Sequence, residues 1–211
     1  NLKLKNTDLK SFNLPALMSV GGYVELYSND SLTSFSLPAL MSVGGYVLLR
    51  GNDSLTSFSL PALAGGSVSV FDNDILNSFS LPGLSSAKLV EVNSNVALTS
   101  LVLPALTTVD RLHVFEHAVL TSFEAPALTS VGDALRVRGN SALTSFDLSV
   151  LTSVGKDIEV INNPALAQCL VDALVAQIQA GLGIGGDIDI DSNNDSCTCS
   201  EAGGVLEADC P

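Results

Sequence analysis

The chain has 211 residues, of which 46% are hydrophobic and 15% charged, a balance that argues against a disordered polar chain. Its formal net charge is −13, which argues against a nucleic-acid partner, because such affinity depends on neutralising phosphates. Polar residues such as Asp172 and Gln177 interrupt the most apolar segment, residues 165–184, so a transmembrane span is not expected.

The charge is unevenly distributed along the chain. Residues 1–156 include 12 acidic and 9 basic residues, whereas residues 157–211 include 10 acidic residues and no basic one. Three of the lysines, Lys3, Lys5 and Lys10, lie near the start. One end is therefore predicted to be strongly acidic, and the other to carry a group of lysines.

A four-residue phrase, Leu-Thr-Ser-Phe in its fullest form, recurs along most of the chain. Its copies begin at Leu9, Leu32, Leu55, Leu76, Leu98, Leu120 and Leu143, with a weaker copy at Leu166, and the spacings are 23, 23, 21, 22, 22, 23 and 23 residues. A unit of this length cannot bury its apolar side alone, so successive units must stack. We predict solenoid repeats with a period of 21–23 over residues 1–163 and a C-terminal cap over residues 164–211.

Each unit contains two strand-like pieces, and equivalent positions form columns through the stack. One predicted inward column is mostly phenylalanine: Phe12, Phe35, Phe58, Phe79, Leu101, Phe123 and Phe146. A second is aliphatic: Leu26, Leu49, Val70, Val92, Val114, Val137, Val160 and Ile190. A third is mostly asparagine: Asn29, Asn52, Asn73, Asn95, His117, Asn140, Asn163 and Asn193. We expect the asparagines to close the turns by bonding to main-chain groups.

Residues 165–180 have the periodicity of an amphipathic helix that ends at Gly181. Its predicted apolar face consists of Leu170, Val171, Leu174, Val175 and Ile178. A short strand over residues 187–191 is expected to follow. We predict that the helix caps the open end of the core.

All four cysteines lie in the last quarter of the chain. An even number of clustered cysteines favours disulfides, and the Cys-Thr-Cys spacing does not suit a zinc site. Cys197 and Cys199 are too close to pair comfortably with each other, so we predict the pairs Cys169–Cys197 and Cys199–Cys210. Disulfides predict a secreted or cell-surface protein, on the extracellular or periplasmic side. The start at Asn1 without methionine fits the removal of an export signal.

The pattern Leu-Thr-Ser-Phe-x-Leu-Pro-Ala-Leu-x-Ser-Val-Gly-Gly, followed by a strand and Asn, resembles the receptor L-domain family, a relative of the leucine-rich repeats, over about residues 9–195. The segment that begins Asn163-Pro-Ala-Leu is similar to the ends of secreted or lipid-anchored bacterial surface proteins. The resemblance implies a non-catalytic, ligand-binding solenoid of a bacterial surface protein. We therefore predict a mainly β, right-handed, leucine-rich-repeat-like β-solenoid of about seven to eight turns, with a capping helix and a disulfide-stapled tail.

The outward positions of the second strand hold aromatic and arginine residues, which are enriched at interfaces. They are Tyr23, Tyr27, Tyr46, Leu48, Arg50, Phe71, His113, Phe115, Arg136 and Arg138. We predict that this face binds a protein or a surface polysaccharide. The alternative is that a flanking segment covers part of it.

Two further hypotheses remain open. In one, Lys3, Lys5 and Lys10 contact the acidic end of another copy, and the chain assembles with itself head-to-tail into a surface fibre. The alternative is a preceding segment that covers the lysine end. In the other, a regular column of hydroxyls binds ice; its members are Thr33, Thr56, Thr99, Thr121 and Thr144. The alternative is that the repeat forms this column for structural reasons.

No catalytic constellation is expected. His113 and His117 lack the His-Glu-x-x-His order of a metalloprotease and fit structural roles. The one cofactor considered is Ca²⁺, because Asp187, Asp189 and Asp191 would present carboxylates on one face of a strand. The segment lacks the glycine and distal glutamate of an EF-hand, so a solvated acidic end is the favoured interpretation.

Overall fold

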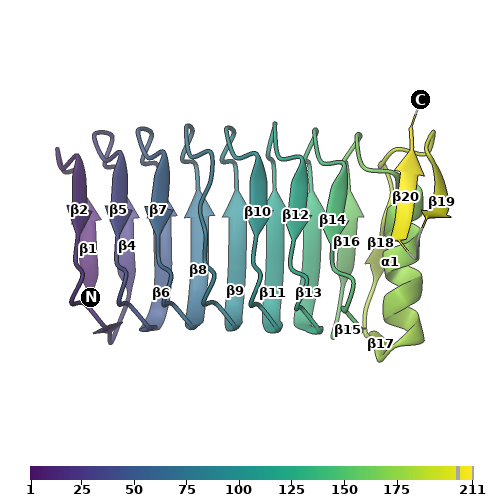
Figure 1. Ribbon diagram of the computed structural model, residues 1–211, viewed down its shortest axis with the longest axis horizontal. Coiled ribbons are helices and arrows are strands. Elements are labelled where there is room, and N and C mark those ends of the chain that lie inside the picture. Colours follow the sequence, from purple (N-terminus) through teal and green to yellow (C-terminus); the bar gives the residue numbers. More distant parts are fainter. Residues whose placement is uncertain (203–204, 211) are drawn as a thin grey trace.

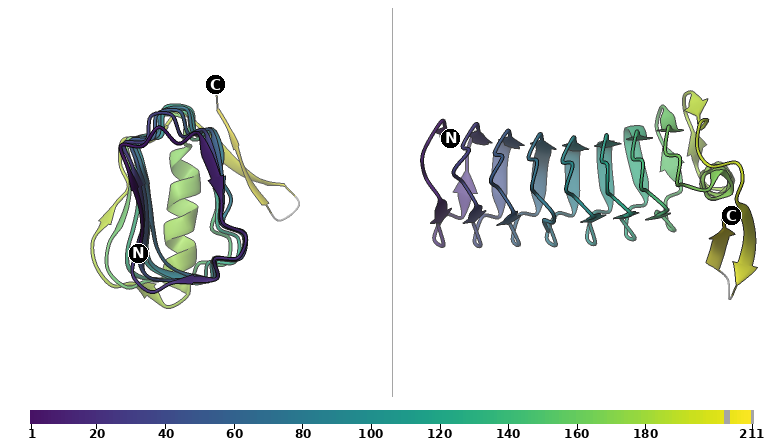
Figure 2. Two further views of the ribbon diagram at one scale, coloured as in Figure 1. Left: turned by 90° about the vertical axis from the view of Figure 1, so that its left-hand side faces the viewer. Right: turned by 90° about the horizontal axis from the view of Figure 1, so that it is seen from above.

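The computed structural model describes residues 1–202 and 205–210 and shows a parallel β-solenoid of about seven turns with one helix. The turns stack along one axis and nearly superimpose when viewed down it (Figures 1 and 2). One strand of nearly every turn joins a 12-stranded sheet, here called the long sheet. Its strands are β1 (Leu2–Lys5), β3 (Ser19–Val20), β4 (Val24–Tyr27), β6 (Ser42–Arg50), β8 (Gly65–Phe71), β9 (Ser86–Asn93), β11 (Thr108–Phe115), β13 (Ser130–Arg138), β15 (Ser153–Val154), β16 (Ile158–Ile161), β17 (Gly183–Ile184) and β18 (Ile188–Asp189).

Two smaller parallel sheets form the opposite wall of the solenoid. One contains β2 (Ser11–Asn13), β5 (Ser34–Ser36) and β7 (Ser57–Ser59), and the other contains β10 (Ser100–Val102), β12 (Ser122–Glu124) and β14 (Ser145–Asp147). A single bridge between Ser59 and Ser80 continues the first of these sheets into the next turn. The predicted mainly β solenoid is therefore confirmed.

The predicted inward columns form the core. Phe12, Phe35 and Phe58 align in register, with ring centroids 5.3 and 5.4 Å apart, and Phe79 stacks on Phe58 at 4.9 Å. The aliphatic column is fully buried from Leu26 onward through the middle of the stack. Each residue packs against its equivalent one strand away, so every turn needs its neighbours to bury its apolar side.

The asparagine ladder is also confirmed. Asn52 is fully buried, and its side-chain amide donates to the backbone oxygen of Leu26 at 3.0 Å and to Oδ1 of Asn73 at 3.1 Å. His117 takes the same place in its turn, with ring nitrogens 3.2 Å from the carbonyl oxygens of Asn95 and Val92. Burial lowers the pKa of His117 below its usual range.

Helix α1 (Gln168–Ala180) covers the core at the C-terminal end, as predicted, but it begins three residues later than expected. The reason is local: the backbone N–H of Leu166 donates to the carbonyl of Asn163 at 2.9 Å, the same bond that joins Leu32 to Asn29 in the first turns. The chain thus completes a repeat turn before the helix starts. Strand β18 is likewise shorter than the predicted strand over residues 187–191. Only Ile188 and Asp189 align with β16, opposite Ile158 and Glu159.

The predicted disulfide pairing is wrong. The bonds join Cys169 to Cys199 and Cys197 to Cys210, with Cα–Cα distances of 6.0 and 4.2 Å. The cause is an antiparallel hairpin of β19 (Thr198–Ala202) and β20 (Val205–Asp209), in which Thr198 faces Asp209 and Cys197 is therefore brought opposite Cys210. Cys199 then remains for Cys169, in the first turn of α1.

Among the described helices, none has the length and apolar character needed to cross a membrane.

Candidate ligand-binding site on the outer face of the long sheet

The side of the long sheet that points away from the core, here called the outer face, carries all of the predicted binding residues. Register places eight of them in two rows that run along the solenoid, whereas Tyr23 and Tyr46 lie before these rows, where Tyr46 aligns with Ser67 of β8. The middle row is Lys3, Glu25, Leu48, Ser69, Glu91, His113, Arg136, Glu159 and Asp189. The distal row, two residues further along each strand, is Lys5, Tyr27, Arg50, Phe71, Asn93, Phe115, Arg138 and Ile161.

Cations and aromatic rings pack against one another in the distal row. The ammonium of Lys5 lies 5.0 Å from the ring centre of Tyr27, and the guanidinium of Arg138 lies 4.7 Å from that of Phe115. Phe115 is only 8% exposed as a result. The expectation that Phe115 is an exposed contact residue is therefore wrong, because Arg138 from the next strand covers its ring.

His113 is also buried, contrary to expectation, at 9% exposure. Its ring stacks on that of Phe115 at 5.2 Å, and its Nε2 has no hydrogen-bond partner among the described residues. Burial, followed by the charges of Arg136 and Arg111, lowers the pKa of His113 to about 4. The imidazole is therefore neutral at physiological pH.

Ion pairs occupy much of both ends of the outer face. Lys3 lies 2.9 Å from Glu25 at one end. At the other, Glu159 lies 3.4 Å from Arg136 and 3.5 Å from Arg138. These charges are already neutralised within the chain, which leaves the middle of the face as the place where a ligand would find free polar groups.

A depression with a volume of about 820 Å³ lies in that middle region, over β6, β8, β9 and β11. Its lining includes Tyr46, Ser67, Ser69, Lys88, Leu89 and Arg111. The volume falls within the range typical of ligand pockets.

The depression arises because the central turns are short. Six residues separate Leu40 from Val47, and six separate Leu128 from Leu135, but only four separate Leu63 from Val68. The ladder shifts register on both sides of β8 to accommodate the missing residues. Small side chains on β8 then leave the face hollow between bulkier neighbours.

Gly66 at this point has a φ of +114°, a conformation that side chains other than glycine rarely adopt. A Cβ there would also lie 3.3 Å from the carbonyl oxygen of Val43. The glycine thus permits the shortened path of the chain into β8.

Tyr46 forms one wall and is held in place from two directions. Its ring stacks on Tyr23, with centroids 5.5 Å apart and planes 10° apart. Its hydroxyl donates to Glu25, which in turn pairs with Lys3. The hydrogen bond to Glu25 raises the pKa of Tyr46. The hydrogen bonds that Glu25 accepts from Tyr46 and Lys3 lower the pKa of Glu25. The wall is therefore ordered before any ligand arrives.

Lys88 and Arg111 form the opposite wall, and both are exposed. Within the described residues, neither lies within 4 Å of a carboxylate. Asp110 also lines the depression, but its carboxylate turns toward β13: Oδ1 would lie 3.0 Å from a Cβ added at Gly132.

Of the predicted binding residues, only Tyr46 lines the depression, with Tyr23 supporting it. Sequence reasoning missed Ser67, Ser69, Lys88 and Arg111, because none belongs to a repeated column. The signal that could have found them is the 21-residue spacing, the shortest of the series, between Leu55 and Leu76.

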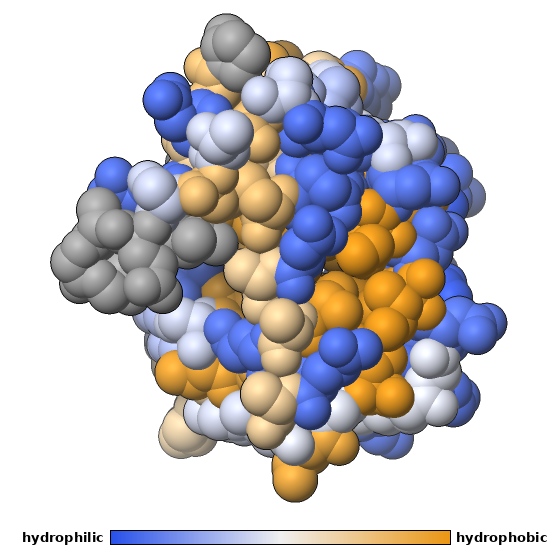
Figure 3. Space-filling view, turned by 90° about the vertical axis from the view of Figure 1, so that its right-hand side faces the viewer, coloured by the Kyte–Doolittle hydropathy of each residue, from blue (hydrophilic) through white to orange (hydrophobic). Residues whose placement is uncertain are grey.

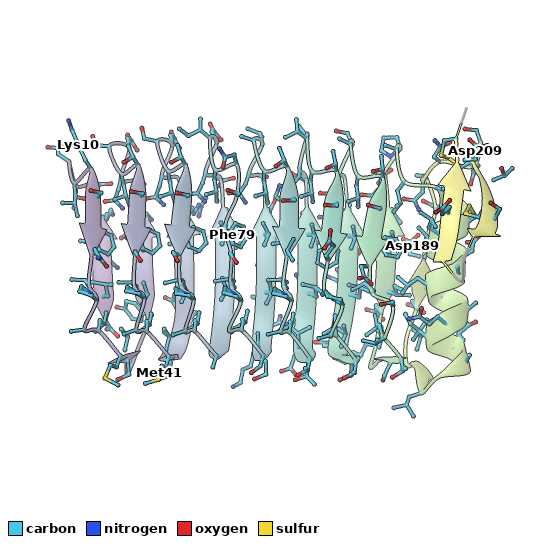
Figure 4. The ribbon with its side chains drawn as sticks, in the orientation of Figure 1. Lys10, Met41, Phe79, Asp189 and Asp209 are labelled. Carbon is cyan, nitrogen blue, oxygen red and sulfur yellow. A yellow bond between two sulfur atoms is a disulfide. The ribbon has the colours of Figure 1, made fainter. Side chains whose placement is uncertain are left out.

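The residues of the assembly hypothesis lie at the two ends. Lys10 and Asp189 are exposed at opposite ends of the long axis (Figure 4). Lys3 is paired with Glu25, and both Lys3 and Lys5 lie over the ring of Tyr27. At the acidic end, Figure 3 shows apolar patches among the hydrophilic side chains, and Leu182 is 85% exposed. Asp187 and Asp191 are exposed as well, and the described residues contain no group of three potential metal ligands.

The threonine column serves the backbone. Each Oγ1 donates to a carbonyl oxygen of the preceding turn, at 3.0 Å for Thr33 and Thr56 and at 3.1 Å for Thr121. A second such column, which the sequence reasoning missed, contains Ser85, Thr107, Thr129 and Thr152. These hydroxyl protons are engaged within the protein, which supports the structural interpretation of the columns.

Comparison with known proteins found no matching family model, no matching curated protein and no matching solved structure.

Proposed function

We propose that the protein is a non-catalytic, extracellular binding module whose ligand occupies the depression on the outer face of the long sheet. The observation that carries this proposal is the depression itself, in which a pre-ordered tyrosine wall faces, across a serine floor, two cations that form no ion pair with the described residues. Two disulfides agree with an oxidising compartment. The resemblance to receptor L domains supports the same role, and we propose a right-handed, leucine-rich-repeat-like winding on that basis.

The test is to fill the depression. Ser67 lies half-buried on its floor, so Ser67→Phe should occupy the space that a ligand needs. Ser59→Phe is the matched control, because Ser59 is an exposed strand serine on a different sheet. Both variants and the parent would be applied to oligosaccharide and peptide arrays after their folding is checked by circular dichroism.

We expect the parent and Ser59→Phe to bind the same ligands, and Ser67→Phe to lose at least about tenfold in affinity. Equal binding by all three proteins would place the ligand elsewhere, and the absence of any bound ligand would reject the proposed function.

Head-to-tail assembly is the second candidate, supported by the exposed Lys10 and Asp189 at opposite ends. It has less support, because Lys3 is committed to Glu25 and helix α1 covers the core at the acidic end. Analytical ultracentrifugation at low and high salt would test it: salt-sensitive polymers that Lys10→Glu disrupts are expected, and a monomer under all conditions would reject it.

A further inference from the structure

The charge of the depression is opposite to that of the chain. The net charge is −13, yet the lining contains two bases, Lys88 and Arg111, and one acid, Asp110. Of the nine lysines and arginines, five form ion pairs within the described residues: Lys3, Arg50, Arg136, Arg138 and Lys156. Lys88 and Arg111 do not, although acidic residues outnumber basic ones. They are therefore free to pair with an anionic ligand.

Three carboxylates lie near these cations, and in the described part of the chain none comes within 4 Å of them: Asp110, Glu91 and Asp133, the last of which is paired with Lys156 at 2.9 Å. Asp110 is part of the lining, but its Oδ1 lies over Gly132 of β13. Glu91 lies in the middle row between Ser69 and His113, and burial raises its pKa while the charge of Arg111 opposes that rise. Glu91 is thus the residue whose charge opposes an anionic ligand most directly.

The remaining surface suits a sugar better than a peptide. The ring of Tyr46 is 38% exposed and offers a flat apolar surface, and Ser67 and Ser69 offer hydroxyls on the floor. An extended peptide would usually add to a free strand edge. Here β6, β8, β9 and β11 are each paired on both sides, so no such edge is present at the depression.

We infer that the depression binds an acidic oligosaccharide, of the type built from uronic acids, with Lys88 and Arg111 as the anchors of its carboxylates. A sugar ring packs its C–H face on Tyr46, its hydroxyls bond to Ser67 and Ser69, and Arg111 takes a carboxylate with its planar fork. This inference rests on the proposed function and names its ligand class.

The experiment is calorimetric titration with trimers of galacturonic, glucuronic, mannuronic and guluronic acid, each paired with its carboxyl-reduced, neutral counterpart. We expect at least one acidic trimer to bind at least about tenfold more tightly than its neutral form, and this preference to shrink in high salt. Hexaglutamate serves as the acidic peptide comparison and is expected not to compete.

The variants test the anchors. Lys88→Gln together with Arg111→Gln should reduce affinity for the acidic trimer at least about tenfold. Lys10→Gln, which removes an exposed lysine at the end of the solenoid, is the matched control and should leave affinity unchanged. Glu91→Gln removes the opposing charge and should tighten binding about two- to fivefold.

The outcomes separate this inference from the proposed function. Suppose that Ser67→Phe abolishes ligand binding, but acidic and neutral trimers bind equally or the double variant binds normally. This result would overturn the inference and leave the proposed function standing. Equal binding of hexaglutamate would replace the sugar with an acidic peptide. Failure of every acidic trimer to bind would overturn the inference, and only failure of the whole array would also remove the proposed function.

Discussion

The two faces of the long sheet follow different rules. On the inner face, the same kind of side chain returns in every turn, since each one packs on its equivalent in the next strand. On the outer face, the middle row changes from Leu48 to Ser69 to Glu91 to His113 over four adjacent strands. Repetition therefore marks the part of the chain that maintains the fold, and departure from repetition marks the part that is free to bind.

The largest expected effect comes from the inner face. Leu49→Ala, at a fully buried position on the inner face of β6 between Leu26 and Val70, should lower the free energy of unfolding by about 2–5 kcal/mol. Leu48→Ala on the outer face of β6 is the control and should cost about 1 kcal/mol. Urea denaturation measures both, and equal losses would contradict the distinction between the faces.

A smaller but still large effect is expected in the asparagine ladder. Asn52→Ala leaves the N–H of Asn29 and the carbonyl of Leu26 buried without their partner, which should cost about 2–4 kcal/mol. Asn77→Ala, at an exposed position outside the ladder, should change the free energy of unfolding by less than about 0.5 kcal/mol. A neutral Asn52 variant would show that other groups close the turn.

The histidines predict how stability depends on pH. Burial lowers the folded-state pKa of His113, to about 4, and that of His117, below the unfolded value of about 6.5. The unfolded chain then binds more protons, so stability is fully present above pH 6.5 and falls as the pH is lowered toward 4. His113→Gln should reduce this loss in pH-dependent melting experiments, and an identical profile for parent and variant would contradict it.

The smallest expected effect is on ligand affinity and compares two tyrosines of the outer face, one inside the depression and one outside it. Tyr46→Phe keeps the ring on Tyr23 but removes its hydrogen bond to Glu25, so the wall of the depression should become less ordered. Thermal melting should be nearly unchanged, with ligand affinity reduced about two- to fivefold. Tyr27→Phe, outside the depression, is the control and should leave affinity unchanged.

Much of the fold could be predicted because period alone decides which residues face inward. The phenylalanine, aliphatic and asparagine columns, the capping role of the helix and its end at Gly181 all follow from spacing. The start of the helix and the disulfide pairing could not be predicted in the same way. The first depends on a repeat turn at Leu166, and the second on a hairpin that lies outside the repeat.

The candidate site was predictable only in outline. The sequence placed aromatic and arginine residues on the outer face, but exposure there depends on side chains from adjacent strands, as the cover of Arg138 over Phe115 illustrates. The cations Lys88 and Arg111 stand 23 residues apart, in positions that no column singles out. Only the parallel register brings their strands together, next to β8.

The sequence by itself determined that this chain is a stack of turns with a buried core, because a 21–23-residue period repeats the same inward residues at the same height in every turn. The tertiary structure alone decided where the stack is hollow and which charges stay unpaired. Those properties depend on small differences between neighbouring turns, such as the shortened path into β8, and become visible only when the strands lie side by side.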